Sequence, residues 1–127
     1  MRALRPQLSG EGEFARYVDE VLRPEGYRLV GVFDEGVEQA RAVGGFRAGH
    51  SLAWEHYLYL DDLSTVETAR RRGHARLVLD WLVDETRRLG CDQLHLDSAV
   101  APQRADAHRL YLNAGYAINA LHFARRV

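Results

Sequence analysis

Lysine is absent from the chain, and all 17 of its basic residues are arginine. They nearly balance 18 acidic residues, which gives a net charge of −1 with histidine neutral. Proteins dedicated to nucleic-acid binding usually carry a clear basic excess. The charge balance therefore argues against nucleic acid as a partner, even though three arginines stand together at positions 70–72.

Cysteine occurs once, so no disulfide forms within the chain. Cys91 precedes an apolar strand pattern, which favours a buried small side chain over a nucleophile. The chain also lacks a run of about 18 apolar residues and an apolar signal core after Met1. We therefore expect no membrane span and a cytoplasmic protein. The six histidines show no metal-ligand spacing with a carboxylate partner, so we expect no metal site.

The remaining composition is that of an ordinary globular protein. The chain has 127 residues, of which 46% are hydrophobic and 28% are charged. This length is enough for one domain with a sizeable core. We therefore expect a single domain over residues 1–127.

Hydrophobic periodicity predicts interleaved strands and helices. Strands are expected over residues 4–7, 27–33, 37–46, 52–65, 93–98 and 116–123, with a turn at 34–36 and a loop at 47–50. Helices are expected from Ser9 or Gly10 to Pro24 and Gly26, from Gly73 to Gly90, and over 105–114. A hairpin followed by strand, helix and strand implies antiparallel pairing and then a parallel pair with a right-handed crossover. The fold class is therefore α/β with a mixed (α+β) sheet flanked by helices.

Side-chain patterns indicate which residues face the core. The helix after Gly73 is expected to bury one broad apolar face, formed by Leu77, Val78, Trp81, Leu82 and Leu89. Strict alternation along 52–65 places one set of side chains on one sheet face, namely Tyr57, Tyr59, Asp61 and Leu63. The same alternation places His56, Leu58, Leu60 and Asp62 on the other face. The pair Gly44-Gly45 suggests a bulge or a close backbone approach.

The stretch from Leu63 to Leu82 combines a strand end, an arginine-rich turn and the start of a helix. A helix N-terminus offers unpaired N–H groups and the positive end of the helix dipole, which suits phosphate. Gly73 lets a phosphate approach the backbone without meeting a Cβ atom. The alternative for this turn is ordinary solvated surface.

The spacing Arg70-x-x-Gly73-x-Ala75 resembles the Q/R-x-x-G-x-G/A signature of the GNAT N-acetyltransferases. The strand that ends at Leu63-Ser64-Thr65 stands where that family has one, and the order of elements is similar along nearly the whole chain. The resemblance implies a GNAT-like acyl-CoA N-acyltransferase fold that binds acetyl-CoA as co-substrate. The residues it implicates in binding are Leu63, Ser64, Thr65, Arg70, Arg71, Arg72, Gly73, His74, Ala75 and Arg76.

A second stretch resembles the family near the C-terminus. The segment from Ala107 to Tyr116 looks like the family's A-x-x-L/F-Y-x-x-x-G-F/Y pattern and places Tyr111 at the family's tyrosine. The resemblance implies that Tyr111 protonates the departing thiolate, since a phenol keeps its proton at neutral pH. Many relatives carry asparagine seven residues earlier, where this chain has Arg104. The alternative is a core tyrosine on a helix stripe.

The base that deprotonates the amine is expected on the strand before Leu63. Several relatives carry a carboxylate or histidine two or four residues before this position, which points to Asp61. Asp62 and Glu55 are weaker candidates, and Asp61 is equally suited to binding the substrate ammonium.

The resemblance implies acetyl transfer to a primary amine of a small metabolite or of a peptide or protein. No nucleophile for a covalent intermediate is evident, so direct attack in a ternary complex is expected. The acidic residues near Leu63 favour a cationic acceptor. A non-catalytic acyl-CoA-binding or interaction module of the same fold is the alternative. A homodimer, common among relatives, would pair along the expected strand edge near Leu121 to Phe123.

Overall fold

The protein is described by a computed structural model that covers residues 11–66 and 73–127. The chain divides into two compact units, Met1–Leu96 and Asp97–Val127. The strand predicted at 4–7 and the three arginines at 70–72 lie outside the described residues. The described elements are helices and strands of a mixed sheet, which confirms the predicted fold class.

The first unit begins with a helix that tightens and then stops at a glycine. Helix α1 (Glu11–Tyr17) continues through one π turn (Val18–Leu22) and one 3₁₀ turn (Arg23–Glu25). Gly26 follows with φ 94°, a left-handed conformation that favours glycine. The predicted helix end is therefore confirmed.

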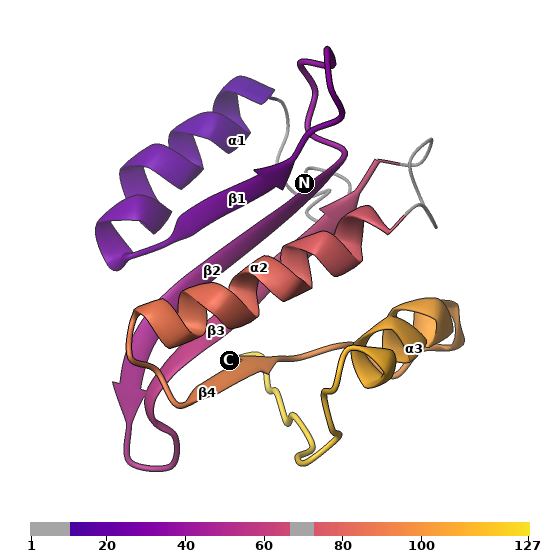
Figure 1. Ribbon diagram of the computed structural model, residues 1–127. Helices are drawn as coiled ribbons and strands as arrows, with labels where there is room; N and C mark the ends of the chain where they lie inside the picture. Colours follow the sequence, from indigo (N-terminus) through magenta and orange to yellow (C-terminus); the bar gives the residue numbers. More distant parts are fainter. Residues whose placement is uncertain (1–10, 67–72) are drawn as a thin grey trace. The chain divides into compact units, whose positions relative to one another are not determined.

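A four-stranded sheet forms the body of this unit (Figure 1). Its strands are β1 (Arg28–Val32), β2 (Ala42–Ser51), β3 (Glu55–Thr65) and β4 (Gln93–Leu96), in that spatial order. The β1–β2 and β2–β3 pairs are antiparallel, whereas the β3–β4 pair is parallel. The predicted parallel crossover is thus confirmed.

Two boundaries of the long hairpin were predicted wrongly. The loop expected at 47–50 is part of β2, and the strand expected from Val37 begins only at Ala42. The turn lies between Ser51 and Glu55, where the Ser51 hydroxyl accepts a hydrogen bond from the Trp54 N–H at 3.0 Å. Serine commonly closes turns in this way. The ladder from Arg47 to Ser51 against Tyr59 to Glu55 keeps the strand continuous.

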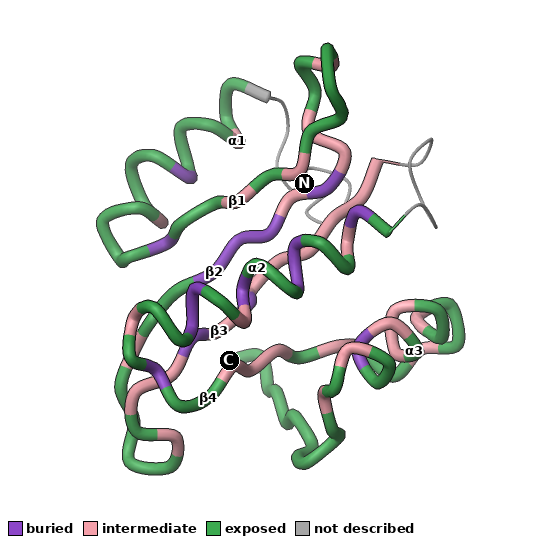
Figure 2. Tube along the Cα trace, viewed as in Figure 1, coloured by how far each residue is buried: buried purple, intermediate pink, exposed green. Residues whose placement is uncertain are grey.

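Helix α2 (His74–Arg88) covers one face of the sheet and contacts all four strands (Figures 1 and 2). Its side chains Val78, Leu79 and Leu82 are fully buried, as are Phe46 and Leu58 of the sheet. Burying such a side chain contributes about 1.5–3 kcal/mol. The predicted face is wrong for Leu77 and Trp81, which are 55% and 39% exposed. The stripe that faces the sheet is turned toward Leu79, Glu85 and Thr86 instead.

Glu85 is a buried carboxylate on this stripe, and its burial was not predicted from the sequence. It accepts hydrogen bonds from Arg88 at 2.8 Å and from Arg28 of β1 at 2.6 Å. The hydrogen bond from Arg88 is the main reason that the pKa of Glu85 falls from 4.5 to about 2; Arg28 adds to the effect and burial opposes it. The carboxylate therefore links α2 to β1.

Replacing Glu85 by glutamine is expected to change the acid stability of the fold. Because its pKa is depressed in the folded state, Glu85 contributes stability above about pH 4.5, and this is lost as the pH falls toward 2. Urea unfolding of Glu85→Gln should show lower stability at neutral pH and a shallower loss over that range. The exposed Asp84→Asn is the control. An unchanged acid dependence in Glu85→Gln would contradict this assignment.

The second unit is short and contains one 3₁₀ turn (Pro102–Arg104) and helix α3 (Ala105–Asn113). Gly115, with φ 93°, ends the helix as predicted. The strand predicted over 116–123 is wrong: these residues have no regular structure, and Ile118, Leu121 and Phe123 are more than three-quarters exposed. A strand needs a neighbouring ladder, and no described strand pairs with this segment. The edge expected to form a dimer is therefore absent from the described chain.

Candidate active site

A β-bulge in β3 sets the geometry of the candidate site. Gly45 pairs with Asp62, whereas the next residue, Phe46, pairs with Leu60. Asp61 is therefore the extra residue of the bulge. The glycine pair predicted to mark a bulge does so, although the inserted residue lies on the opposite strand.

The bulge overturns the predicted faces of two residues, since paired residues share a face of the sheet. A Cβ atom on Gly44 would touch Val78 of α2 and Leu60, so Gly44 and its partner Leu63 face α2. A Cβ atom on Gly45 would lie 1.6 Å from the Tyr27 hydroxyl, on the other face. Its partner Asp62 therefore lies on that other face, with Asp61.

Asp61 is held by Arg47, which lies across from it on β2. The guanidinium donates from Nε and Nη2 to the two carboxylate oxygens, at 2.8 Å each. This hydrogen bonding is the main reason that the pKa of Arg47 is raised. Arg47 also lies over the Tyr59 ring, 5.9 Å from its centroid. Sequence reasoning missed this pair because it placed Arg47 in a loop.

Asp62 is bound by a second residue that sequence reasoning missed. The Tyr27 hydroxyl donates to Asp62 Oδ2 at 2.8 Å. Tyr27 is only 6% exposed, and its ring crosses Gly45 so closely that no side chain fits there. The predicted close approach at the glycine pair was the available signal, but it did not reveal which side chain approaches.

Aromatic side chains continue along the same face toward the start of β3. The Trp54 ring stacks on His95 with 3.8 Å between centroids and lies nearly parallel to Tyr59 at 6.3 Å. Tyr57 meets Trp54 edge-on at 5.2 Å. Tyr59 and His95 are partners in the parallel ladder. The face thus combines π surfaces, which attract cations, with the two carboxylates.

The sheet opens beyond the bulge. Pairing of β3 with β4 ends at Leu60 and Leu96, whereas pairing with β2 continues to Thr65. The Val66 N–H donates to the Arg41 carbonyl on the β2 side at 2.9 Å. Backbone N–H and C=O groups point to alternate sides along a strand. Because those of Val66 point toward β2, the N–H and C=O groups of Leu63 and Thr65 point away from β2. They face the side where β4 has ended.

The bulge determines which residues of β3 direct their backbone groups toward this opening. Before it, the His56 carbonyl faces β4, since it accepts from the Asp92 N–H at 3.0 Å. In a regular strand the even-numbered residues Asp62 and Ser64 would then face the opening. The extra residue shifts the alternation, so that Leu63 and Thr65 do so instead.

The first residues of α2 are tied to the end of β3. Gly73 caps the helix with φ 82°, and among the described residues no atom beyond its chain neighbours and the helix backbone lies within 4 Å of the position of a Cβ atom there. The buried His74 ring lies 2.9 Å from Asp34 Oδ1, and Asp34 in turn pairs with Arg41 at 3.4 Å. Arg41 is the residue that accepts from Val66. These contacts bring predicted residues 63–65 and 73–76 to one end of the first unit (Figure 1).

Tyr111 lies in the second unit, on α3, and is 9% exposed. Burial raises the pKa of Tyr111, while the charge of Arg104 and a hydrogen bond to it work in the opposite direction. The Tyr116 ring lies edge-on at 6.1 Å. The phenol therefore keeps its proton at neutral pH, as the predicted acid requires.

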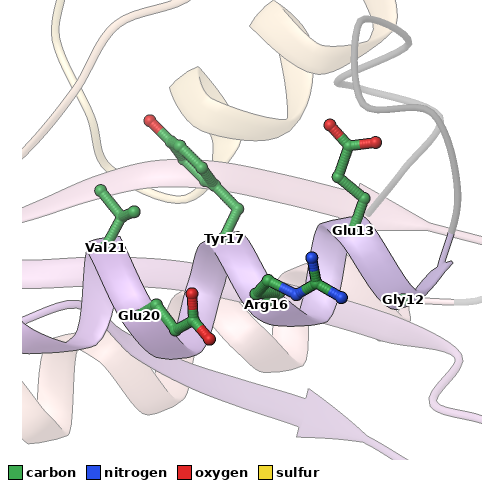
Figure 3. Close-up of a pocket in the computed structure, with 6 residues that line it drawn as sticks. All are labelled: Gly12, Glu13, Arg16, Tyr17, Glu20 and Val21. Carbon is green, nitrogen blue, oxygen red and sulfur yellow. The ribbon is translucent and has the colours of Figure 1, made fainter.

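A separate hollow of about 430 Å³ lies along the first helical segment (Figure 3). It is lined by Gly12, Glu13, Arg16, Tyr17, Glu20 and Val21. None of the predicted site residues that the structure describes lines this hollow. Among the described residues, no group of three metal-binding side chains occurs, and no helix is long and apolar enough to cross a membrane.

The family model described as the acetyltransferase (GNAT) family matches residues 2–116. The chain belongs to the GNAT acetyltransferase family. Membership confirms the resemblance carried by the Arg70-to-Ala75 spacing and makes the chain an acyl-CoA-dependent N-acetyltransferase. The match extends over most of both compact units.

Individual relatives agree with this placement. An uncharacterized N-acetyltransferase of Bacillus subtilis (strain 168), YhdJ, is 29% identical over the whole chain and 87% of its own length. A probable acetyltransferase of known structure has a TM-score of 0.82 at 16% identity, with 99% of this chain and 84% of that chain covered. A ribosomal-protein-alanine N-acetyltransferase from Brucella melitensis biovar Abortus 2308 has a TM-score of 0.77 at 18% identity, with coverage of 98% and 87%. These structural likenesses support a GNAT fold.

Proposed function

We propose that the protein transfers the acetyl group of acetyl-CoA to a primary amine by direct attack in a ternary complex. The observation that carries the proposal is the opening beyond Leu60, into which Leu63 and Thr65 turn their backbone groups. A backbone N–H that stabilises the thioester oxygen as it gains charge is worth about 2.7–4 kcal/mol of barrier. We further propose that residues 1–127 act as one domain.

The co-substrate would be held at the end of β3 and the start of α2, which the contacts of Asp34 link to each other. In this proposal Leu63, Ser64 and Thr65 bind the acetyl and pantetheine portion. The pyrophosphate lies at the start of α2, on the backbone of Gly73, His74, Ala75 and Arg76, with Arg70, Arg71 and Arg72 contributing from the preceding turn. The open space above Gly73 suits a phosphate that approaches a helix N-terminus.

Asp61 is proposed to act on the acceptor amine, as a base or as a ligand of its ammonium. Its position in the bulge, beside the opening, supports a place close to the reacting nitrogen. Its bidentate contact with Arg47 favours the ammonium-binding role. Proton abstraction by Asp61 would first require that a charged partner be displaced, which is costly for such a pair.

Tyr111 is proposed as the acid that gives its proton to the departing thiolate. Two observations support this role, the match of the Ala107-to-Tyr116 segment to the family pattern and the raised pKa of the phenol. After the transfer, the phenolate regains a proton from solvent.

The acceptor is proposed to be a cationic amine on a small metabolite or on a peptide or protein. The carboxylates of Asp61 and Asp62 and the π faces of Trp54 and Tyr59 support a positively charged group. Among the structural neighbours, one acts on ribosomal-protein alanine and another is an aminoglycoside acetyltransferase. Both kinds of acceptor therefore belong in the test.

The test is release of CoA thiol from acetyl-CoA with three acceptors: spermine, an alanine-terminated peptide and an aminoglycoside. The proposal predicts saturable, acceptor-dependent thiol release and an acetylated product by mass spectrometry. If acetyl-CoA binds but no amine across a wide panel is acetylated, the alternative of a non-catalytic acyl-CoA-binding module replaces it.

A further inference from the structure

We propose that Asp62 is the catalytic base and that Tyr27 is the residue that positions it. The inference rests on the proposed acetyl transfer and deepens it by assigning the proton acceptor. From the sequence, Asp62 was a weaker candidate than Asp61, and strict alternation placed it on the face of Leu58 and Leu60. The bulge returns it to the face of Asp61, immediately before Leu63.

The first support is the position of Asp62 relative to the opening. Leu63 turns its backbone toward the opening, while Asp62 directs its side chain to the sheet face opposite α2. Adjacent residues therefore supply an N–H for the thioester oxygen and a carboxylate for the attacking nitrogen. This arrangement exists only because Asp61 is inserted.

The second support is the rigidity of Tyr27. The tyrosine directly follows Gly26, and its N–H donates to the Leu22 carbonyl at 3.1 Å, which anchors its backbone to the end of the helical segment. Its ring is buried against the bare backbone of Gly45. The Tyr27 hydroxyl therefore has a fixed position, and its hydrogen bond to Asp62 Oδ2 orients the carboxylate.

The third support is the contrast with Asp61. Asp61 gives both oxygens to a guanidinium, whereas Asp62 Oδ2 accepts a hydrogen bond from a phenol. A phenol is able to keep its hydrogen bond while the carboxylate gains a proton. Asp61, oriented by Arg47, is then left to bind the acceptor's ammonium.

The proton transfer is balanced within this arrangement. An N–H bond of the acceptor's ammonium breaks and an O–H bond forms on Asp62, so that a neutral amine attacks the thioester carbon. As the C–S bond breaks, Tyr111 supplies the proton that the sulfur gains. The proton on Asp62, and the second proton that the nitrogen loses as the amide forms, pass to solvent; one of them replaces the proton that Tyr111 gave.

The first experiment compares Asp62→Asn with Asp61→Asn, using the best of the three acceptors above and hydroxylamine. Removal of a general base costs about a hundredfold or more. The kcat/KM of Asp62→Asn with the ammonium acceptor should therefore fall by that factor. Hydroxylamine is largely unprotonated at neutral pH and needs no base, so its rate should survive. Asp61→Asn should mainly raise the acceptor KM, and the exposed Asp84→Asn serves as the control.

The second experiment tests Tyr27 through a double-mutant cycle. Tyr27→Phe keeps the ring over Gly45 and removes the hydroxyl. Because hydrogen bonds to charged groups are strong, kcat should fall about tenfold, with the acetyl-CoA KM unchanged. In the Asp62→Asn background the same substitution should cost almost nothing, since its effect runs through Asp62. The exposed Tyr17→Phe is the matched control.

The outcomes separate this inference from the proposed function. If the wild type acetylates an amine but Asp62→Asn behaves like Asp84→Asn, or loses hydroxylamine and ammonium acceptors equally, Asp62 is not the base. If Tyr27→Phe costs the same in both backgrounds, its role is structural. If the wild-type protein acetylates neither amines nor hydroxylamine, both the proposed function and this inference are wrong.

Discussion

Tyr111→Phe is expected to lower kcat by about 10²–10⁴-fold while the affinity for acetyl-CoA stays nearly unchanged. The substitution removes only the hydroxyl from a side chain that is 9% exposed, so the packing of α3 is retained. The thiolate then leaves without a proton donor. Steady-state kinetics together with a CoA binding titration measure the two quantities separately.

The pH dependence adds a second check on Tyr111. Burial raises its pKa above the ordinary value of 10.0, so the acid stays protonated up to that pH and kcat should not fall on its account below it. Tyr116→Phe, at the neighbouring ring, is the matched control and should keep the wild-type rate. An unchanged kcat in Tyr111→Phe would end the acid assignment and leave the tyrosine as core packing.

Gly45→Ala is expected to damage both stability and activity. The new Cβ atom would lie 1.6 Å from the Tyr27 hydroxyl and 2.3 Å from its ring, so the tyrosine must move. Overpacking of this kind typically costs about 1–3 kcal/mol, which thermal unfolding would detect. The moved hydroxyl no longer orients Asp62, so kcat should fall at least as far as in Tyr27→Phe.

The control for Gly45→Ala is Gly12→Ala, because a Cβ atom at Gly12 would meet no described atom within 4 Å beyond its chain neighbours and the helix backbone. That variant should keep wild-type stability and activity. If Gly45→Ala also kept both, the close approach of Tyr27 to the sheet would be wrong, and the positioning role of Tyr27 would fall with it.

Local signals predicted much of the fold. The helix start after Gly73, the helix end at Gly90 and the parallel pairing of β3 with β4 follow from spacing and glycine positions that act within a few residues. The strand predicted over 116–123 failed because a strand also requires a partner, which an apolar pattern does not supply. Similarly, the hairpin turn at Ser51 depends on a side-chain hydrogen bond rather than on a glycine or proline.

The candidate site was predicted only in part. The residues at the end of β3 and the start of α2 follow from the family signature, and they lie at one end of the first unit. The positions of Asp62 and Leu63 were reversed, because an alternating pattern counts residues and cannot register an insertion. Tyr27 and Arg47 come from segments far from Asp61 and Asp62 in the sequence, and their contacts depend on the β2–β3 register.

The most direct test of the central claim is thermal unfolding with acetyl-CoA, CoA and 3′-phospho-ADP, which lacks the pantetheine arm. A ligand that binds only the native state stabilises it by about 2.7 kcal/mol at a hundred times its Kd. We predict a clear rise in Tm with saturating acetyl-CoA and CoA, and a smaller rise with the truncated nucleotide. An unchanged Tm with saturating acetyl-CoA would contradict the acyl-CoA site, and the turn before Gly73 would then be ordinary solvated surface.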